Sequence, residues 1–318
     1  MARSITLTGE QNTYKLEKDQ ILGQGKFGTV YKSENVAIKE IKKNTTINPE
    51  EEIKNQESIT HPNVLKILEV INTPDKLYIV LDIVHGQDLF YYIQTHGALS
   101  INNARKMFKE LIYAIEACHK VGIVHRDIKP ENILLKRDTL DLILADFGLS
   151  AAFIDNDGNI FKLRQRCGST KYAPPELFND RNIEYEAQPY DIWSAAIVLF
   201  VSVNGRFPFT EATNKCNLFE RHQQNKYKFP YDFSNSLIEL LSGMLTINPE
   251  ERWTIPQIKS CAWWNNLNID NKNNISPGCL LTTTKKESTI KPELSISWSD
   301  SYSDTEITNN KCPNCSIL

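Results

Sequence analysis

Four short stretches of this 318-residue chain carry residue types suited to handling phosphate groups. Gly23–Val30 holds three glycines, which let a backbone approach phosphate closely and point its N–H groups at the oxygens. Val36–Lys39 ends an apolar run with a lysine, a cation suited to phosphate. His125–Asn132 and Asp146–Gly148 add two aspartates and an asparagine. Together and in this order the four stretches predict chemistry on a phosphate group.

The glycine-rich stretch is weak evidence alone, because G-x-G-x-x-G also occurs in plain hairpins and in dinucleotide-binding turns. Here a strand, Thr29–Lys32, follows the glycines instead of a helix, which disfavours the dinucleotide interpretation. Lys39 by itself also fits an ordinary lysine at the end of a strand. The prediction therefore depends on the ordered set of stretches and not on any one of them.

The elements that must position these residues change character along the chain. The first part indicates strands, with one helix from Asn48-Pro49 to about Thr60 that has three glutamates in its first turn. Helical spacing dominates after Gly86. The expected strands are Tyr14–Leu22, Thr29–Lys32, Val36–Lys42, Val64–Ile71 and Leu77–Val84. The expected later helices are Asp88–Thr95, Ser100–Val121, Asp191–Val203 and Ser236–Leu245.

The ordered set resembles the signature of eukaryotic protein kinases from about Tyr14 to Trp264. Glu176 stands where that family has the glutamate of its A-P-E motif, and Arg252 stands where the partner of this glutamate is expected. The resemblance implies an α+β, bilobal protein kinase fold, with a small antiparallel β-sheet lobe and a larger helical lobe. It divides the chain into an N-terminal extension (1–13), a kinase domain (14–264, with lobes 14–81 and 85–264) and a polar tail (265–318) expected to be disordered.

The resemblance also assigns the roles that phosphoryl transfer requires, namely positioning and charge neutralisation. Lys39 is expected to hold the α- and β-phosphates of ATP and to pair with Glu52. Glu51 is the alternative partner, because three glutamates stand in a row. Asn132 and Asp146 are expected to bind Mg²⁺. ATP and Mg²⁺ are therefore the implied cofactors.

Asp127 is expected to accept or orient the proton of the substrate hydroxyl, and Lys129 to steady the transferring phosphate. A lysine at the latter position resembles serine/threonine kinases, so the implied substrates are proteins with serine or threonine acceptors. Ser169 is expected to bond to both residues. A pseudokinase scaffold is disfavoured because no catalytic group is missing, and a small-molecule kinase because Glu176 and Arg252 are present.

The expected nucleotide pocket follows from the same alignment of motifs. Adenine would lie between aliphatic side chains, and the backbone of residues 82–84 would offer it hydrogen bonds. In isolation each of these aliphatic residues fits plain core equally well. The implied ATP-binding residues are Leu22, Gly23, Gln24, Gly25, Lys26, Phe27, Gly28, Thr29, Val30, Ala37, Lys39, Leu81, Asp82, Val84 and Leu134.

The segment between Asp146 and Glu176 departs from many kinases, which are activated by phosphorylation about eleven positions before that glutamate. Gln165 stands at this position, and no hydroxyl residue lies between Ala151 and Gly168. The hypothesis is that activity does not require phosphorylation there. A second departure is Gln56, a polar residue where an apolar one is usual, which needs a hydrogen-bond partner if buried.

Cys167–Tyr172, Tyr190–Ser194 and Gly205–Phe209 resemble the calmodulin-dependent-kinase-like group. Within it, the missing phosphosite, Gln56 and the stretch Phe153–Cys167 are most similar to the checkpoint kinase 1 family, with Snf1-type kinases as the alternative. The checkpoint resemblance implies a role in cell-cycle arrest after DNA damage, with nuclear and cytoplasmic pools.

Asp88 and Glu131 stand where kinases that prefer basic substrates place carboxylates facing an arginine three residues before the acceptor. The alternative interpretation is a pair of ordinary solvated acids. The net charge of −3 gives no electrostatic reason to expect nucleic acid as a direct partner. Protein substrates with serine or threonine acceptors are the expected partners, and direct binding to nucleic acid is not expected.

The last four residues, Cys315-Ser316-Ile317-Leu318, match a prenylation pattern whose terminal leucine favours geranylgeranyl. Ser316 is not aliphatic, so the match is imperfect. Membrane association is expected only if Cys315 carries the lipid, and one chain alone binds membranes weakly. The odd number of cysteines, seven, and the absence of a signal-peptide pattern at the N-terminus favour an intracellular, reduced protein.

Overall fold

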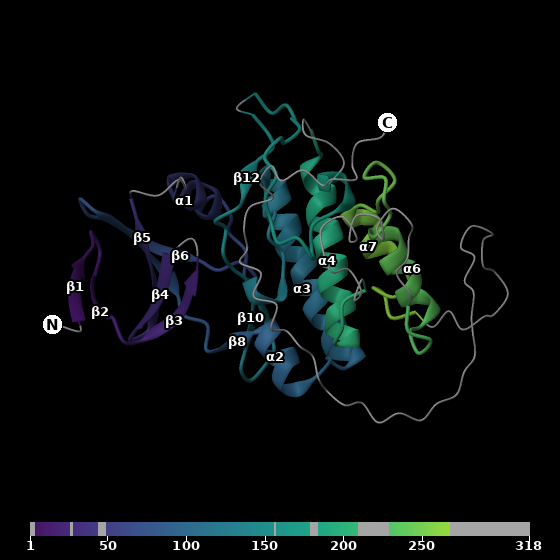
Figure 1. Cartoon of the computed structure of the whole chain (residues 1–318), viewed down its shortest axis with the longest axis horizontal. Coiled ribbons are helices and arrows are strands. Elements are labelled where there is room, and N and C mark those ends of the chain that lie inside the picture. Colours follow the sequence, from purple (N-terminus) through teal and green to yellow (C-terminus); the bar gives the residue numbers. More distant parts are fainter. Residues whose placement is uncertain are drawn as a thin grey trace, which may run out of the picture.

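The computed structural model describes residues 4–25, 28–43, 49–155, 157–178, 184–208 and 229–267. Two lobes follow each other along the long axis, a small one made mainly of strands and a larger one made mainly of helices (Figure 1). This confirms the α+β, two-lobed fold predicted from the sequence. Of the predicted site residues, Lys26, Phe27 and Cys315 lie outside the described residues, as does the tail beyond residue 267.

A five-stranded antiparallel sheet in the order β3-β4-β5-β7-β6 forms the small lobe. Its register pairs Ala37 with Leu81 and Lys39 with Ile79, so β5 lies beside β7 over its whole length. The short spacing between β4 and β5 produces a tight turn with Glu34 at φ 44°. The strands are β3 (Ile21–Gly25), β4 (Gly28–Ser33), β5 (Val36–Lys42), β6 (Ile67–Asn72) and β7 (Lys76–Asp82).

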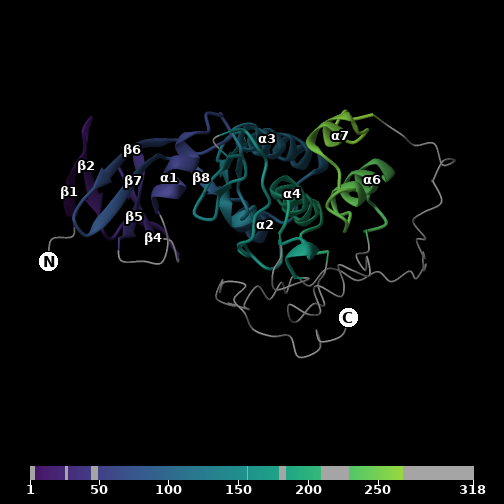
Figure 2. The same ribbon diagram turned by 90° about the horizontal axis from the view of Figure 1, so that it is seen from above.

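An N-terminal hairpin, β1 (Ser4–Thr8) and β2 (Thr13–Glu17), adds a second layer to the small lobe. Leu7 and Leu16 are buried in one apolar cluster with Tyr31 and Ile38 of the sheet. Figure 2 shows the hairpin at the end of the molecule away from the helical lobe. The extension that the sequence placed before residue 14 is therefore packed on the small lobe from residue 4 onward.

The single strand predicted over Tyr14–Leu22 is divided in two. Residues 18–20 form a turn between β2 and β3, because the N–H of Gln20 donates to the carbonyl of Glu17 at 3.1 Å. The prediction missed this break because the run contains no glycine or proline before residue 23.

The strand predicted over Val64–Ile71 also starts later than expected, at Ile67. The N–H of Leu65 donates to the carbonyl of Leu144 in the helical lobe at 2.9 Å, and Val64 forms only an isolated bridge to Leu144. This part of the chain therefore joins the two lobes instead of extending β6.

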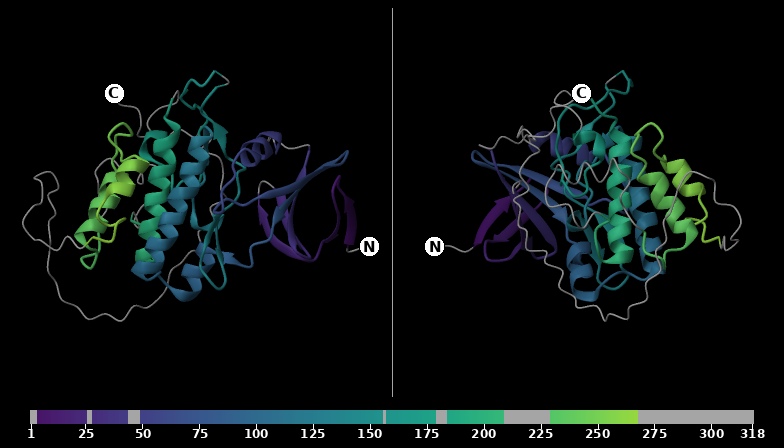
Figure 3. Two further views of the ribbon diagram at one scale, coloured as in Figure 1. Left: turned by 180° about the vertical axis from the view of Figure 1, so that it is seen from behind. Right: turned by 45° about the vertical axis from the view of Figure 1, so that its right-hand side comes forward.

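Two long helices, α3 (Ile101–Lys120) and α4 (Ala187–Asn204), pack side by side in the helical lobe (Figure 3). Ser100 begins α3 by accepting the N–H of Asn103 through its side chain, as expected for an N-cap. Phe108 packs edge-on against Trp263, with ring centroids 5.8 Å apart. The other helices are α2 (Leu89–His96), α6 (Asn235–Met244) and α7 (Ile255–Ser260). No helix of the described part of the chain is long and apolar enough to cross a membrane.

Two small sheets hold the loops that carry the predicted catalytic residues. β10 (Ile133–Lys136) pairs with β11 (Leu142–Leu144) on one side and with β8 (Gly86–Asp88) on the other. β9 (Ile123–Val124) pairs with β12 (Ala151–Ala152). The loop 125–132 connects β9 to β10, and the segment 145–150 connects β11 to β12. Both segments therefore run between the same two small sheets.

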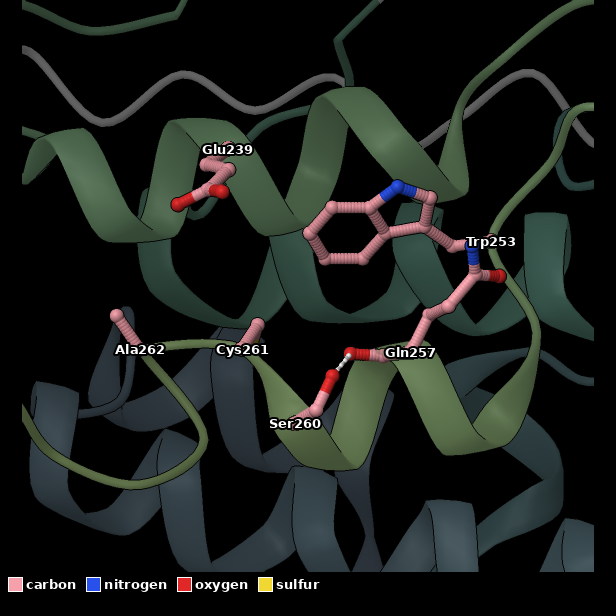
Figure 4. A pocket seen from close by; sticks show the side chains of 6 residues that line it. All are labelled: Glu239, Trp253, Gln257, Ser260, Cys261 and Ala262. Carbon is pink, nitrogen blue, oxygen red and sulfur yellow. Dashed lines mark hydrogen bonds between the residues drawn. The ribbon is translucent and has the colours of Figure 1, made fainter. Parts of the chain in front are cut away.

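A pocket of about 300 Å³ opens beside α6 and α7 at the end of the helical lobe (Figure 4). The hydroxyl of Ser260 in this pocket donates to the backbone carbonyl of Gln257 at 2.8 Å. The pocket is lined by Glu239, Trp253, Gln257, Ser260, Cys261 and Ala262. None of the predicted site residues contributes to it.

Candidate active site

Lys39 lies between two carboxylates from distant parts of the chain. Its Nζ donates to Oε1 of Glu52 at 2.5 Å and to Oδ1 of Asp146 at 3.0 Å. Lys39 comes from β5, Glu52 from helix α1 (Pro49–Glu57) and Asp146 from the segment after β11. Glu51, the alternative partner, is exposed. Successive residues of an α-helix point about 100° apart around its axis, so Glu52 faces Lys39 while Glu51 faces outward.

The charges of this cluster shift one another's pKa values. Burial lowers the pKa of Lys39, but the carboxylates of Asp146 and Glu52 outweigh it and raise that pKa above its ordinary value. Burial raises the pKa of Glu52, because Lys39 offsets only part of the desolvation. Burial would also raise the pKa of Asp146, but Lys39 lowers it below its ordinary value. Lys39 is therefore a firmly held cation beside an ionised Asp146.

Asp127 forms the centre of a second network. Its Oδ1 accepts the Ser169 hydroxyl at 2.8 Å and the Ser169 N–H at 3.2 Å. Its Oδ2 accepts Nδ2 of Asn132 at 3.0 Å and lies 3.1 Å from Nζ of Lys129. Lys129 also donates to Oγ of Ser169 at 2.9 Å. Both oxygens of the carboxylate are therefore oriented by donors from two different segments of the chain.

Asp191, which sequence reasoning did not single out as a site residue, fixes the backbone of the 125–132 loop. Its fully buried carboxylate accepts the N–H groups of His125 and Arg126, each at 2.9 Å, and its Oδ2 lies 2.9 Å from Nε2 of His119. Arg126 has φ 64°, a strained conformation that needs such fixed surroundings. The available signal was an acid within an apolar helical run, because a buried carboxylate requires donors.

The segment that carries Asp146 is attached to the same loop. The N–H of Ala145 donates to the carbonyl of Asn132 at 2.9 Å, and Nε2 of His125 lies 3.1 Å from the carbonyl of Ala145. The rings of His125 and Phe147 meet edge-on, with centroids 4.7 Å apart. The two residues predicted to hold Mg²⁺, Asn132 and Asp146, therefore belong to neighbouring, directly bonded segments.

Asn132 and Asp146 fit a cation that also binds phosphate. Asn132 donates through Nδ2 to Asp127, so its remaining polar atom is an amide oxygen. The side chain of Asp146 keeps 35% of its surface exposed, with one oxygen bonded to Lys39. Protein sites usually bind Mg²⁺ through one or two carboxylates together with substrate phosphates. The two residues supply a donor set of this kind.

The predicted adenine pocket is one side of an apolar cluster between the lobes. Ala37 and Leu81 are buried in it, and Val30, Val84 and Leu134 pack against it. The cluster also contains Ala145, so the apolar surface extends to the residue before Asp146, one of the two predicted metal ligands.

The rest of the predicted pocket is more open. Leu22, Gly23, Gln24 and Gly25 are exposed, and Gly28 and Thr29 are half-buried. Gly28 has φ 133°, and a Cβ there would lie 2.3 Å from the carbonyl oxygen of Glu40, so only glycine fits. The N–H of Asp82 donates to the carbonyl of Lys66 at 3.1 Å. Contacts of Lys26 and Phe27 fall outside the described residues.

Arg126 contacts the position where many kinases carry an activating phosphate. Its Nε donates to the carbonyl of Leu149 at 2.7 Å, and its Nη2 donates to Oε1 of Gln165 at 3.4 Å. Its Nη1 donates to the hydroxyl of Tyr185 at 3.3 Å, and that hydroxyl donates to the carbonyl of Gln165 at 2.8 Å. Neutral acceptors therefore satisfy the guanidinium without a phosphate.

Asp88 and Glu131, the predicted substrate-binding acids, come from elements that pack against each other, β8 and the short helix Pro130–Asn132. Asp88 caps α2 by accepting the N–H of Tyr91 at 2.7 Å. Glu131 is exposed. The capping role of Asp88 agrees with the alternative interpretation, in which it is an ordinary solvated acid. Its charge nevertheless remains at the surface.

Glu176 and Arg252 form a bidentate ion pair, as the resemblance implies. Nη1 and Nη2 of Arg252 donate to the two oxygens of Glu176 at 2.8 and 2.9 Å. The protein kinase domain family matches residues 16–264, most of the chain. The chain belongs to the protein kinase family.

Three curated relatives show how far the likeness of this kinase extends. Serine/threonine-protein kinase SIK1 of Rattus norvegicus is 37% identical over 260 residues, which cover 77% of this chain and 32% of that protein. CBL-interacting protein kinase 26 of Oryza sativa subsp. japonica is 38% identical over 255 residues, covering 76% and 50% of the two chains. CBL-interacting protein kinase 11 of the same plant is 34% identical over 299 residues, covering 88% and 59%.

The kinase chain thus spans from about a third to about three fifths of the length of these relatives. The relatives agree with the predicted calmodulin-dependent-kinase-like group, which includes the Snf1 type. They do not support the checkpoint kinase 1 family in particular.

Proposed function

We propose that this chain is an ATP-dependent serine/threonine protein kinase, which transfers the γ-phosphate of ATP to serine or threonine hydroxyls of proteins. The observation that carries the proposal is the direct connection between the two networks. Lys39 binds Asp146, and Asp127 binds Asn132, whose backbone carbonyl accepts the N–H of Ala145 next to Asp146. The side chains suited to bind the nucleotide, hold the metal and orient the acceptor hydroxyl therefore lie together in one site.

Asp127 is suited to orient the acceptor hydroxyl and take its proton. The donors from Ser169, Asn132 and Lys129 fix the plane of its carboxylate, which aligns an incoming hydroxyl for attack. Lys129 adds a positive charge at this point, where negative charge collects on the transferred phosphoryl group. The carboxylate is also 5% exposed, so water competes weakly for it.

Lys39 is suited to hold the phosphates of the nucleotide, because Glu52 and Asp146 fix its ammonium group from two sides. Asn132 and Asp146 would hold Mg²⁺. When bound, the ion neutralises charge on the phosphate oxygens and fixes their geometry. The apolar surface of Ala37, Leu81 and Leu134 would receive the adenine ring.

The test is incorporation of labelled phosphate from ATP into a generic protein, compared between wild type and Asp127→Asn. Wild-type incorporation that disappears in the variant supports protein kinase activity, because the amide removes the base and keeps the shape. Absence of incorporation by wild type in the presence of Mg²⁺ favours a pseudokinase scaffold. Phosphorylation of small molecules without phosphorylation of protein favours the small-molecule class.

We further propose membership of the Snf1 type in preference to the checkpoint kinase 1 family. Identity to SIK1 and to the CBL-interacting kinases supports this choice. The checkpoint alternative retains the support of Gln165, which removes the activating phosphosite. Cells that lack this kinase and still arrest normally after DNA damage would argue for the Snf1 type. Loss of the arrest, with nuclear and cytoplasmic protein, would favour the checkpoint alternative.

A preference for arginine three residues before the acceptor is proposed from Asp88 and Glu131. Their elements pack together beside the loop that carries Asp127 and Lys129, so a basic side chain of the substrate would meet two carboxylates. A peptide library should favour arginine at this position. Glu131→Gln and Asp88→Asn should weaken the preference, and the second substitution keeps a good helix cap. Equal rates on peptides with arginine and glutamate there would contradict the proposal.

Prenylation of Cys315 is also proposed, from the terminal four residues. Intact mass of the protein from cells should show an added geranylgeranyl group in wild type and none in Cys315→Ser. Membrane association is proposed only for the lipidated form. An unmodified wild-type mass would exclude the modification.

A further inference from the structure

The helix that carries Glu52 packs on the protein mainly through polar side chains. Glu52, Asn55 and Gln56 of α1 are 4%, 3% and 4% exposed, whereas Ile53 is its only large apolar residue. A surface helix usually docks through an apolar stripe, which is tolerant of small shifts. The position of α1 therefore depends on hydrogen bonds, which are directional and are lost after small displacements.

Each of the three buried polar residues makes a bond to a different part of the molecule. Glu52 accepts Lys39 of β5 at 2.5 Å. Nε2 of Gln56 donates to the carbonyl of Leu65 at 2.7 Å, which supplies the partner that this polar residue was expected to need. Nδ2 of Asn55 donates to Oγ of Ser150 at 3.1 Å. Only the Asn55 bond reaches the segment that follows Asp146.

Ser150 passes this contact to the backbone beside the predicted metal ligand. It is 6% exposed, and its hydroxyl donates to the carbonyl of Phe147 at 2.7 Å while accepting from Asn55. Its N–H also donates to this carbonyl, at 2.9 Å. Phe147 follows Asp146 directly. The turn after Asp146 is thus closed by the same hydroxyl that holds α1.

The buried carboxylate of Glu52 explains why α1 needs hydrogen bonds that hold it in place. Its Oε2 is buried and has no hydrogen-bond partner among the described residues. A buried carboxylate oxygen without a donor is unfavourable, and an outward movement of α1 would expose it to water. The bonds of Asn55 and Gln56 oppose that movement.

We propose that Asn55 and Ser150 are positioning residues, whose hydrogen bond assembles Glu52 and Asp146 around Lys39 in a single step. When the turn after Asp146 forms, the Ser150 hydroxyl accepts the hydrogen bond from Asn55 of α1. This bond brings Glu52 within reach of Lys39. Neither residue is among those predicted to bind the nucleotide or to act on the acceptor hydroxyl. The inference rests on the proposed kinase function, and it assigns the pair a share in forming the active arrangement.

The test measures kcat and the KM for ATP for Asn55→Ala, Ser150→Ala and the double variant. Each single variant should lower kcat about tenfold, with less than about a twofold change in KM, because fewer molecules hold the assembled arrangement. The double variant should fall no further than the lower single variant, because both substitutions remove one bond. Ser150→Thr, which keeps the hydroxyl, should retain wild-type kcat. Glu57→Ala, at an exposed position of α1, is the matched control.

Wild-type kcat in Ser150→Ala, or multiplied losses in the double variant, would overturn the inference. If Asn55→Ala does not fold, Ser150→Ala against Ser150→Thr decides alone, since these differ from wild type by one oxygen or one methyl group. Thermal melting of each variant separates loss of folding from loss of assembly. A wild type without activity removes the proposed function and this inference with it. An active wild type with unaffected Ser150 and Asn55 variants removes only the inference.

Discussion

The hydroxyl of Ser169 donates a hydrogen bond to Oδ1 of Asp127 at 2.8 Å and accepts one from the ammonium group of Lys129 at 2.9 Å. One side chain from the segment between Asp146 and Glu176, here called the activation segment, therefore orients the two residues predicted to act on the acceptor hydroxyl and the transferred phosphate. Gly168 makes this approach possible, because a Cβ there would lie 2.6 Å from the carbonyl oxygen of Arg126. These hydrogen bonds therefore hold the activation segment against the 125–132 loop beside Asp127, the predicted catalytic carboxylate.

Ser169→Ala should lower kcat by about tenfold to a hundredfold, because it removes a hydrogen bond to a charged carboxylate. The KM for ATP should change little, since the hydrogen bonds of the Ser169 side chain go to Asp127 and Lys129 and to no described residue that is predicted to bind the nucleotide. Steady-state kinetics on a fixed peptide would measure both. Ser169→Thr is the control and should retain activity. Equal loss in both variants would show that the hydroxyl has no such role.

Glu52→Gln should lower kcat/KM for ATP by about a hundredfold, because Lys39 loses one of the two carboxylates that position its ammonium. Titration of nucleotide against initial rates measures this ratio. Glu51→Gln is the matched control, one residue away on the exposed face of α1, and should stay within about twofold of wild type. Reversed effects of the two substitutions would make Glu51 the functional partner.

Phosphatase treatment should leave the activity of the purified kinase unchanged, because Leu149, Tyr185 and Gln165 already satisfy Arg126. Gln165→Ala should keep at least about half of the activity, because it removes only the longest of these three bonds. Activity assays before and after treatment, with mass spectrometry of the activation segment, would check both points. An essential phosphate between residues 151 and 168 would refute the hypothesis.

The stability of the small lobe should depend on pH through Glu40. Burial raises the pKa of this carboxyl, but hydrogen bonds from Lys18 and Lys76 outweigh it and hold the pKa below its ordinary value of 4.5. A depressed pKa in the folded state means that the stabilisation is present above the ordinary value and is lost as the pH falls below it.

Glu40→Gln should therefore lower the free energy of unfolding at neutral pH, with a difference from wild type that shrinks below about pH 4.5. Urea unfolding at a series of pH values would measure this difference. Glu57→Gln, at an exposed position, should leave the unfolding curves unchanged at neutral pH. A Glu40→Gln difference that grows on acidification would have the wrong sign for this mechanism.

Helix and strand positions were largely predictable because the apolar periodicity is strong. The expected helix Ser100–Val121 became α3 with Ser100 as its cap, and Val36–Lys42 became β5 without a change of bounds. One prediction was wrong because a backbone group bonds across the molecule. Leu65 bonds to Leu144 of the other lobe, so β6 starts later than its apolar run. Local patterns carry no information about such a partner.

Residue types and their order along the chain were enough to identify the family and to name Lys39, Asp127, Asn132 and Asp146, because phosphoryl transfer restricts which side chains can serve it. Only the tertiary structure decided the contacts that depend on burial and direction. It put Asp191 against the backbone of the 125–132 loop and joined Asn55 to Ser150, and it settled the choice between the expected partner of Lys39, Glu52, and the alternative, Glu51. The contacts of Asp191 and the bond between Asn55 and Ser150 join residues that only packing brings together, and none of the motifs in the sequence indicated them.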